Sequence, residues 1–222
     1  MRIALHLLIT GIFLLGFAPS STAQSLLGGE TVKRGAPAVN VQLGYPELRA
    51  GYHIPVIDQF EIAPRFTFFY AGLGNRISDT LNPPQVGLAF AADFKWNFYS
   101  SARFHVAAIW RVGVNLEFLH GVDAAIQIGL PGGIAMNYEM LEKVDLLFGF
   151  DSSSAVVVTG EPAIYAIPLV FHLGAAIDLS RRMALTLVFE GGPSIATDRA
   201  DGQSGSTVGG WVGGFAGLEF YL

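Results

Sequence analysis

RFHVAAIWRVGVNLEF, residues 103 to 118, is strongly apolar yet contains five strongly polar side chains. In a helix, at about 100° per residue, these five would point to nearly every side and form no polar face. At about 180° per residue they share one parity, and the large apolar residues take the other, with Ile109 as the exception. We therefore predict a long β-strand with one apolar and one polar face. Its polar residues are Arg103, His105, Arg111, Asn115 and Glu117.

The same alternation recurs from residue 39 to the end of the chain. In VGLAFAADFKWNF, residues 86 to 98, bulky apolar side chains alternate with glycine, alanine and charged residues. Charged and histidine side chains fall on the polar parity in segment after segment. They are Arg49, His53, Glu61, Arg65, Asp93, Lys95, Arg103, His105, Arg111, Glu117, Asp145, His172, Asp178, Glu190 and Glu219.

Short and long connections alternate between the predicted strands. We expect short turns at 56–59, 99–102, 139–143 and 180–182, and longer Gly-, Pro- and Ser-rich loops at 71–85, 119–123, 151–162 and 191–207. This alternation is typical of an up-and-down antiparallel meander. A closed single-chain bacterial barrel needs an even number of strands, and residues 39–45 add a tenth to the nine counted from Leu48 onward. We predict an all-β, up-and-down antiparallel transmembrane β-barrel of about ten strands, with eight as the alternative.

The orientation of the two faces decides the class of protein. A soluble lipocalin-like barrel would show the same alternation turned inside out. The polar parity is padded with glycine and alanine, as a narrow lumen filled with long side chains requires. Aromatic residues gather near strand ends, where they would form interfacial girdles, and strands of ten or more residues are long enough to cross a hydrocarbon core. We therefore expect the apolar face to point outward, into lipid.

The first residues have the layout of a secretory signal peptide. Arg2 precedes an apolar run that ends at Ala18, and small residues lead to a cleavage site after Ala23. The alternative, an uncleaved anchor, is disfavoured because the run is shorter than the ~20 residues of a spanning helix. No later run offers 18 uninterrupted apolar residues, so we expect no spanning helix after it. We divide the chain into a signal peptide (1–23), an N-terminal periplasmic extension (24–36) and the barrel (37–222).

Composition narrows the classes of partner. Charged residues make up 14% of the chain, against about 25% in soluble domains. Without Arg2, the chain has 12 Lys+Arg against 18 Asp+Glu, a net charge of −6, which disfavours nucleic acid as a partner. The absence of cysteine excludes disulfides and thiolate metal sites.

The C-terminal residues GLEFYL, 217 to 222, place a glycine before alternating hydrophobic or aromatic residues. With this ending, residues 37 to 222 resemble the small OmpA-like and OmpX-like bacterial outer-membrane barrels, whose assembly machinery recognises such a C-terminal signal. The chain departs from the commonest form by ending in Leu222 instead of phenylalanine. The resemblance implies location in the outer membrane, contact with its lipid, and contact with that machinery during biogenesis. We expect a monomer.

Charges of both signs on the lumen parity are expected to pair with one another, because an unpaired buried charge is costly. A barrel of this size is largely filled by its side chains, so a general diffusion porin is not expected. Polar residues of the loops are candidates for a catalytic Ser-His-Asp set or for calcium binding, but the sequence has no nucleophile-elbow motif and no EF-hand spacing. These residues are His120, Asp123, Ser152 to Ser154, Asp198, Asp201 and Ser204. We therefore predict no catalytic, cofactor or metal site.

The predicted function is a structural or surface-interaction role in the outer membrane. Three alternatives stay open: a narrow channel for ions or small solutes, an enzyme that modifies outer-membrane lipid, and a soluble periplasmic carrier of lipocalin type.

Overall fold

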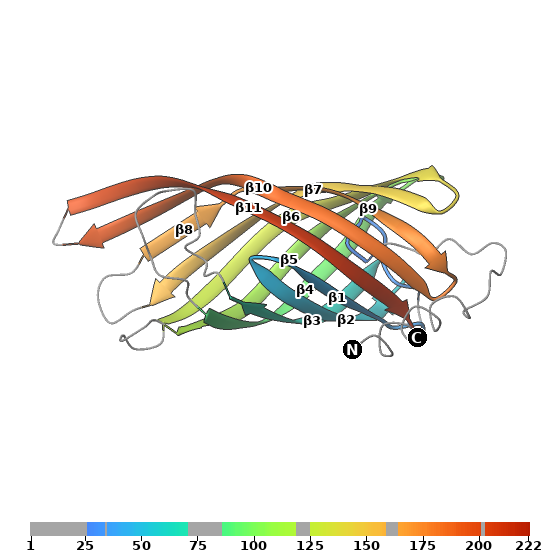
Figure 1. Ribbon diagram of the computed structural model, residues 1–222, viewed down its shortest axis with the longest axis horizontal. Coiled ribbons are helices and arrows are strands. Elements are labelled where there is room, and N and C mark those ends of the chain that lie inside the picture. Colours follow the sequence, from blue (N-terminus) through green and yellow to red (C-terminus); the bar gives the residue numbers. More distant parts are fainter. Residues whose placement is uncertain (1–25, 34, 71–85, 119–124, 159–163, 201–202) are drawn as a thin grey trace, which may run out of the picture.

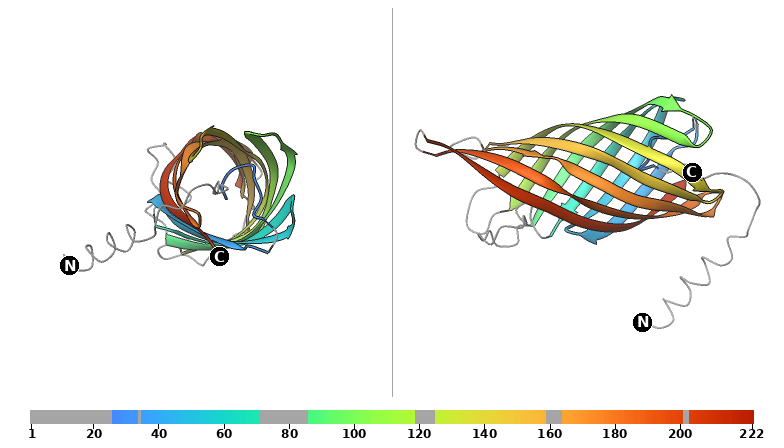
Figure 2. Two further views of the ribbon diagram at one scale, coloured as in Figure 1. Left: turned by 90° about the vertical axis from the view of Figure 1, so that its right-hand side faces the viewer. Right: turned by 90° about the horizontal axis from the view of Figure 1, so that it is seen from above.

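Successive antiparallel strands close into an up-and-down barrel (Figures 1 and 2). The computed structural model describes residues 26–33, 35–70, 86–118, 125–158, 164–200 and 203–222. Its strands are β1 (Ala38–Tyr45), β2 (Glu47–Ile57), β3 (Phe60–Phe69), β4 (Val86–Ser100), β5 (Phe104–Phe118), β6 (Ala125–Leu141), β7 (Val144–Val158), β8 (Ile164–Pro168), β9 (Val170–Ser180), β10 (Met183–Ala200) and β11 (Gln203–Tyr221). β11 pairs with β1 along the whole length of β1, which closes the wall.

β8 and β9 together form one interrupted strand of the wall. Each of them pairs with β7 on one side and with β10 on the other. The break falls at Leu169, directly after Pro168, and the Leu169 amide donates a hydrogen bond to the Pro193 carbonyl at 2.8 Å. The barrel therefore has ten strands, which confirms the count expected from the sequence.

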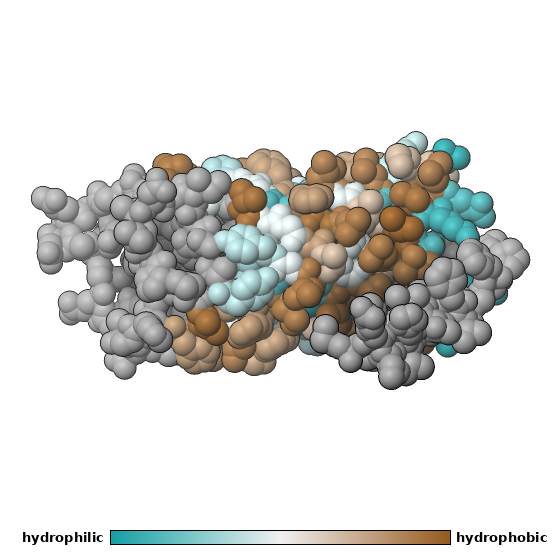
Figure 3. All heavy atoms as spheres, in the orientation of Figure 1, coloured by the Kyte–Doolittle hydropathy of each residue, from teal (hydrophilic) through white to brown (hydrophobic). Residues whose placement is uncertain are grey.

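The two side-chain parities face opposite sides of the wall, as predicted. Glu61 and Lys95 are 0% and 3% exposed, whereas Val112 and Phe189 are 50% and 71% exposed. In Figure 3, hydrophobic residues spread over the middle of the visible outer surface, and hydrophilic ones gather towards one end. The barrel thus has an apolar outer surface and a polar interior, the reverse of a soluble barrel.

The turns between β2 and β3, β4 and β5, β6 and β7, and β9 and β10 lie together at one end of the barrel, which we call the turn end; the opposite end is the loop end. The turn end also contains the C-terminal end of β11, where the Leu222 amide donates to the Pro37 carbonyl at 2.9 Å. Figure 2 marks the C-terminal end of the chain on this side. Among the described residues, no helix is long and apolar enough to cross a bilayer.

Two of the predicted loops are largely strand. β10 and β11 stay paired as far as Ala200 and Gln203, so most of 191–207 is a two-stranded ribbon that extends past its neighbours (Figure 1). β7 continues to Val158, and Ser152 therefore lies in a strand and not in a loop. Glycine and serine are common in turns, but antiparallel pairing satisfies the backbone groups of a Gly- and Ser-rich strand as well as those of any other strand. The predicted loops 71–85 and 119–123 and the predicted signal peptide lie outside the described residues.

Candidate functional site

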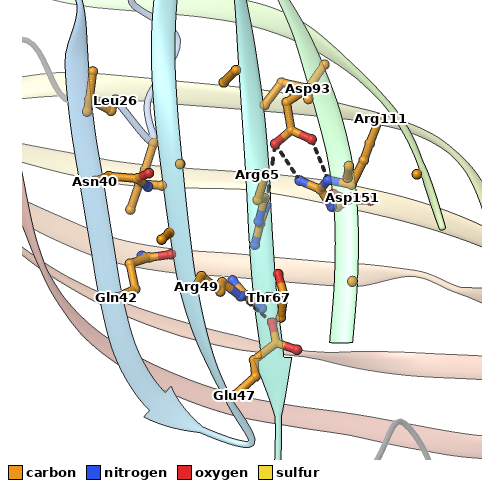
Figure 4. Close-up of a pocket in the computed structure, with 18 of the residues that line it drawn as sticks. Leu26, Asn40, Gln42, Glu47, Arg49, Arg65, Thr67, Asp93, Arg111 and Asp151 are labelled. Carbon is orange, nitrogen blue, oxygen red and sulfur yellow. Dashed lines mark hydrogen bonds and ion pairs between the residues drawn. The ribbon is translucent and has the colours of Figure 1, made fainter. Parts of the chain in front are cut away.

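The lumen contains a cavity of about 270 Å³ between the turn end and the middle of the barrel. Inward-facing residues of β1 to β5, β7, β9 and β10 line it, together with Leu26 and Leu27. Figure 4 shows the polar side chains that point into it. The alternation of the strands places these residues inside, because every second side chain faces the lumen.

Three arginines from β2, β3 and β5 pair with four carboxylates in the cavity. Arg111 donates to both oxygens of Asp93, at 2.6 and 3.0 Å, and to Asp151 at 2.9 Å. Arg65 lies beside the same Asp93, at 3.4 Å (Figure 4). This half of the arrangement is an ion-pair network that joins three strands of one wall, β3, β4 and β5, to β7.

Arg49 joins opposite parts of the wall. It donates to the two oxygens of Glu190 on β10, at 2.5 and 2.7 Å, and also pairs with Glu47 on its own strand. Its guanidinium lies over the Phe215 ring, 3.8 Å from the centroid, in a cation–π contact. We call Arg49, Arg65, Arg111, Glu47, Asp93, Asp151 and Glu190 the arginine cluster; its formal charge is −1.

Part of the cavity lining is apolar, on the same strands that carry residues of the arginine cluster, and most of it was not predicted from the sequence. Leu147 and Val188 are 1% and 5% exposed, and Leu27 packs against them. Ile109 also lines the cavity, in agreement with its parity. Leu147 has the parity of Asp145, and Val188 has that of Glu190, so the signal was present in the sequence.

The turn end of the lumen is occupied by residues 26 to 33, which we call the inner segment. Side chains of the barrel bind its main chain. Glu219 accepts from the Leu26 amide at 3.1 Å, and Lys95 donates to the Leu26 carbonyl at 3.0 Å. Figure 2 shows the N-terminal described residues within the ring of strands. The sequence analysis assigned this stretch to a periplasmic extension, since it has no alternation that relates it to the barrel.

The same mode of binding continues along the inner segment. The Gly29 amide donates to Asn137 at 2.9 Å, and the Gly29 carbonyl accepts from Asn97 at 2.5 Å. The Val32 amide donates to Glu61 at 2.7 Å. The Leu26 and Val32 side chains are 4% and 1% exposed, in a cluster with Ala38 and Tyr221.

Glu30 is the titratable carboxyl of the inner segment. Its carboxylate lies 3.1 Å from the Nε2 atom of His105. Burial raises the pKa of Glu30 to about 7, against the opposing effect of the Lys95 ammonium. The Glu30 carboxyl therefore titrates near neutral pH while the segment is docked.

His53 and His105, which have the lumen parity, each contact a polar side chain. His53 Nδ1 lies 2.8 Å from Glu61, and His105 Nδ1 lies 3.0 Å from the Ser100 hydroxyl. Within the described part of the chain, no three His, Cys, Asp or Glu residues come together in a way that could hold a metal ion. The rim residues weighed for catalysis, Ser152 apart, have side chains outside the described residues.

Most of the charged residues expected in the lumen lie there, with one correction. Arg103 lies in the turn between β4 and β5 and is exposed, because a register shift at Asn97 and Tyr99 shortens the regular part of the pairing. The side chain of Glu117 lies outside the described residues.

No family model matches the chain, and no curated protein is significantly similar to it. Solved outer-membrane structures are similar at low identity. The COG4313 outer-membrane channel from Pseudomonas putida F1 is 11% identical, over 90% of this chain and 100% of that one, with a TM-score of 0.46. The outer-membrane protease OmpT from Escherichia coli is 9% identical, over 84% and 93%, with a TM-score of 0.44. Ail, the attachment invasion locus protein of Yersinia pestis, is 9% identical, over 85% and 99%, with a TM-score of 0.21.

Proposed function

We propose that this chain is an outer-membrane barrel whose lumen is a narrow pathway for small ions and polar solutes. The membrane location is supported by the outer surface. Large apolar side chains on several strands face outward, among them Phe90, Val112 and Leu173, which are 54%, 50% and 58% exposed. In water such a surface would be unfavourable by about 25 cal/mol per Å² of apolar area, whereas lipid covers it without that cost.

The observation that favours a pathway over a purely structural role is the cavity. A structural barrel needs only a packed interior, and in this one the arginine cluster leaves about 270 Å³ of lumen unfilled. Charges of both signs line that space, so a hydrated ion or small polar solute meets a partner at each step. The cavity is far too narrow for general diffusion, which requires the wide lumen of a barrel with ~16 or more strands.

From the sequence alone, a structural or surface-interaction role is the first prediction and a narrow channel is an alternative. We reverse that order because of the cavity. The proposal that the chain is not an enzyme is retained. The arginines and carboxylates of the cavity are paired as ions, and the contacts of His105 with the Ser100 hydroxyl and the Glu30 carboxylate lie outside this cavity.

Single-channel recording of the purified full chain in a planar bilayer tests the pathway. We expect small conductance steps, and a shift of the reversal potential in a salt gradient towards cations for Arg65→Gln. Arg182→Gln is the matched control, because it removes the same charge from an exposed turn outside the lumen. If neither the native protein nor a variant with a displaced inner segment conducts more than the bare bilayer, the proposal is wrong and a structural role is favoured.

A further inference from the structure

We infer that the turn end of the lumen is a peptide-binding site, that the inner segment is its resident ligand, and that release of this segment opens the pathway. The ligand class is a turned peptide with a glycine pair between two apolar anchors. The binding site stands on the contacts alone, whereas the opening of a pathway rests on the proposed function.

The site binds main-chain atoms. Amides and carbonyls of the inner segment are bonded by side chains from β3, β4, β6 and β11, which lie around much of the circumference of the barrel. The segment belongs to no strand, so its backbone relies on these side chains and not on a ladder. A segment held by side chains is released without any change in the wall of the barrel.

The shape of the site selects the peptide. A Cβ atom at Gly28 would lie 2.7 Å from the Asn137 Cβ, and one at Gly29 would overlap the backbone carbonyl of His105. Real Cβ atoms do not approach other atoms so closely, and the strand backbone at His105 is fixed by its ladder. Leu26 and Val32 fill apolar positions on either side of the glycine pair.

The site also contains acceptor groups that the resident segment leaves without a hydrogen bond. Glu219 is 0% exposed, and its Oε1 atom has no hydrogen-bond partner although Oε2 binds the Leu26 amide. Asn40 Oδ1, from the neighbouring strand β1, is buried and unpartnered in the same way. Buried acceptors of this kind are costly unless they are satisfied. The resident segment supplies no hydrogen-bond donor to either of them.

Gly29→Val in the full chain is the decisive variant. It prevents docking of the inner segment but changes no residue of the barrel wall, so the variant should still fold. Like the native protein, it should migrate differently in detergent electrophoresis before and after heating. A fluorescent synthetic peptide of residues 24 to 36 should bind this variant in detergent, as measured by anisotropy. The same peptide with valine at position 29 should bind at least about tenfold more weakly, which corresponds to about 1.4 kcal/mol.

The matched control is Lys33→Gln, because Lys33 belongs to the inner segment but its side chain is exposed. Its site stays occupied, so the native peptide should bind it as weakly as it binds the native protein. Val32→Asp, which places a charge in the apolar pocket, is the second variant if Gly29→Val fails to fold. Equal binding of both peptides, or no binding to either displaced variant, would overturn the inference.

Conductance separates this inference from the proposed function. Gly29→Val should conduct severalfold more than the native protein, and the native peptide should reverse the increase. Specific peptide binding without any conductance supports the site and refutes the pathway. The opposite outcome is a native protein that conducts, with no increase in Gly29→Val or Val32→Asp and no binding of the peptide. That outcome refutes the site and supports the pathway.

Discussion

Val112→Arg tests the orientation of the barrel wall in lipid. Val112 lies near the middle of β5 and points outward, with half of its surface exposed. An arginine on the lipid face of a barrel at mid-depth is unfavourable by about 2–4 kcal/mol. The folded-to-unfolded ratio should therefore fall roughly 30- to 700-fold. Val112→Leu, which remains apolar, should change the free energy of unfolding by less than ~1.5 kcal/mol.

Leu141→Arg is the control for depth. Leu141 is 60% exposed at the last position of β6, beside a short turn. Near the interface, the cost of an arginine falls to about 0–1 kcal/mol. The assay is reversible guanidinium unfolding in phospholipid vesicles, followed by tryptophan fluorescence. If Val112→Arg lowers the free energy of unfolding no more than Leu141→Arg does, the outer face is not in the hydrocarbon and our orientation is refuted.

Three further predictions use the same vesicle assay or the peptide assay. Arg111→Met should lower the free energy of unfolding by about 3–5 kcal/mol, because Asp93 and Asp151 both lose the Arg111 guanidinium, and Asp93→Asn should restore part of it; absence of any rescue would contradict the pairing. Burial raises the Glu30 pKa from 4.5 to about 7, so the docked state binds more protons than the free state and peptide affinity should fall as pH rises through this range. Peptide with Glu30→Gln should lose most of that pH dependence, and an affinity that rises with pH would show the sign to be wrong. Gly113→Ser should destabilise the barrel by about 1–3 kcal/mol, because the new Cβ would lie 2.6 Å from the Cβ of Ala91. Gly132→Ser, whose Cβ would have no atom within 4 Å, should change the free energy of unfolding by less than ~0.5 kcal/mol. Equal effects of the two substitutions would refute the packing.

The strands and their faces were predictable from sequence because lipid and lumen impose opposite polarity at a period of two. Lys95 and Trp96 illustrate the rule: neighbours in the chain, they are 3% and 46% exposed. The tenth strand followed from closure, since an antiparallel edge in lipid leaves backbone groups unsatisfied. The outward-facing residues have odd numbers in β1 and even numbers in β2, and this change of parity marks the tight turn at Pro46.

The candidate site was only half predictable. The arginine cluster follows from parity, but which carboxylate each arginine contacts depends on the curvature of the barrel, as the Arg49 pair with Glu190 across the lumen shows. The docking of the inner segment leaves no periodic signal, because side chains of the barrel bind its backbone at Leu26 and Gly29, and such bonds impose no alternation on the sequence. The Gly-rich ribbon beyond Gly191 was taken for a loop since composition alone does not reveal pairing.

Cysteine accessibility reports which face of the barrel wall meets water, and the native chain contains no cysteine to interfere. Ala91 lines the lumen cavity, and Val112 faces outward on the adjacent strand. In the membrane-embedded protein, Ala91→Cys should react with a small, charged, membrane-impermeant thiol reagent, faster still in combination with Gly29→Val, whereas Val112→Cys should not react. Labelling of Val112→Cys with protection of Ala91→Cys would contradict a hydrated lumen inside a lipid-facing wall.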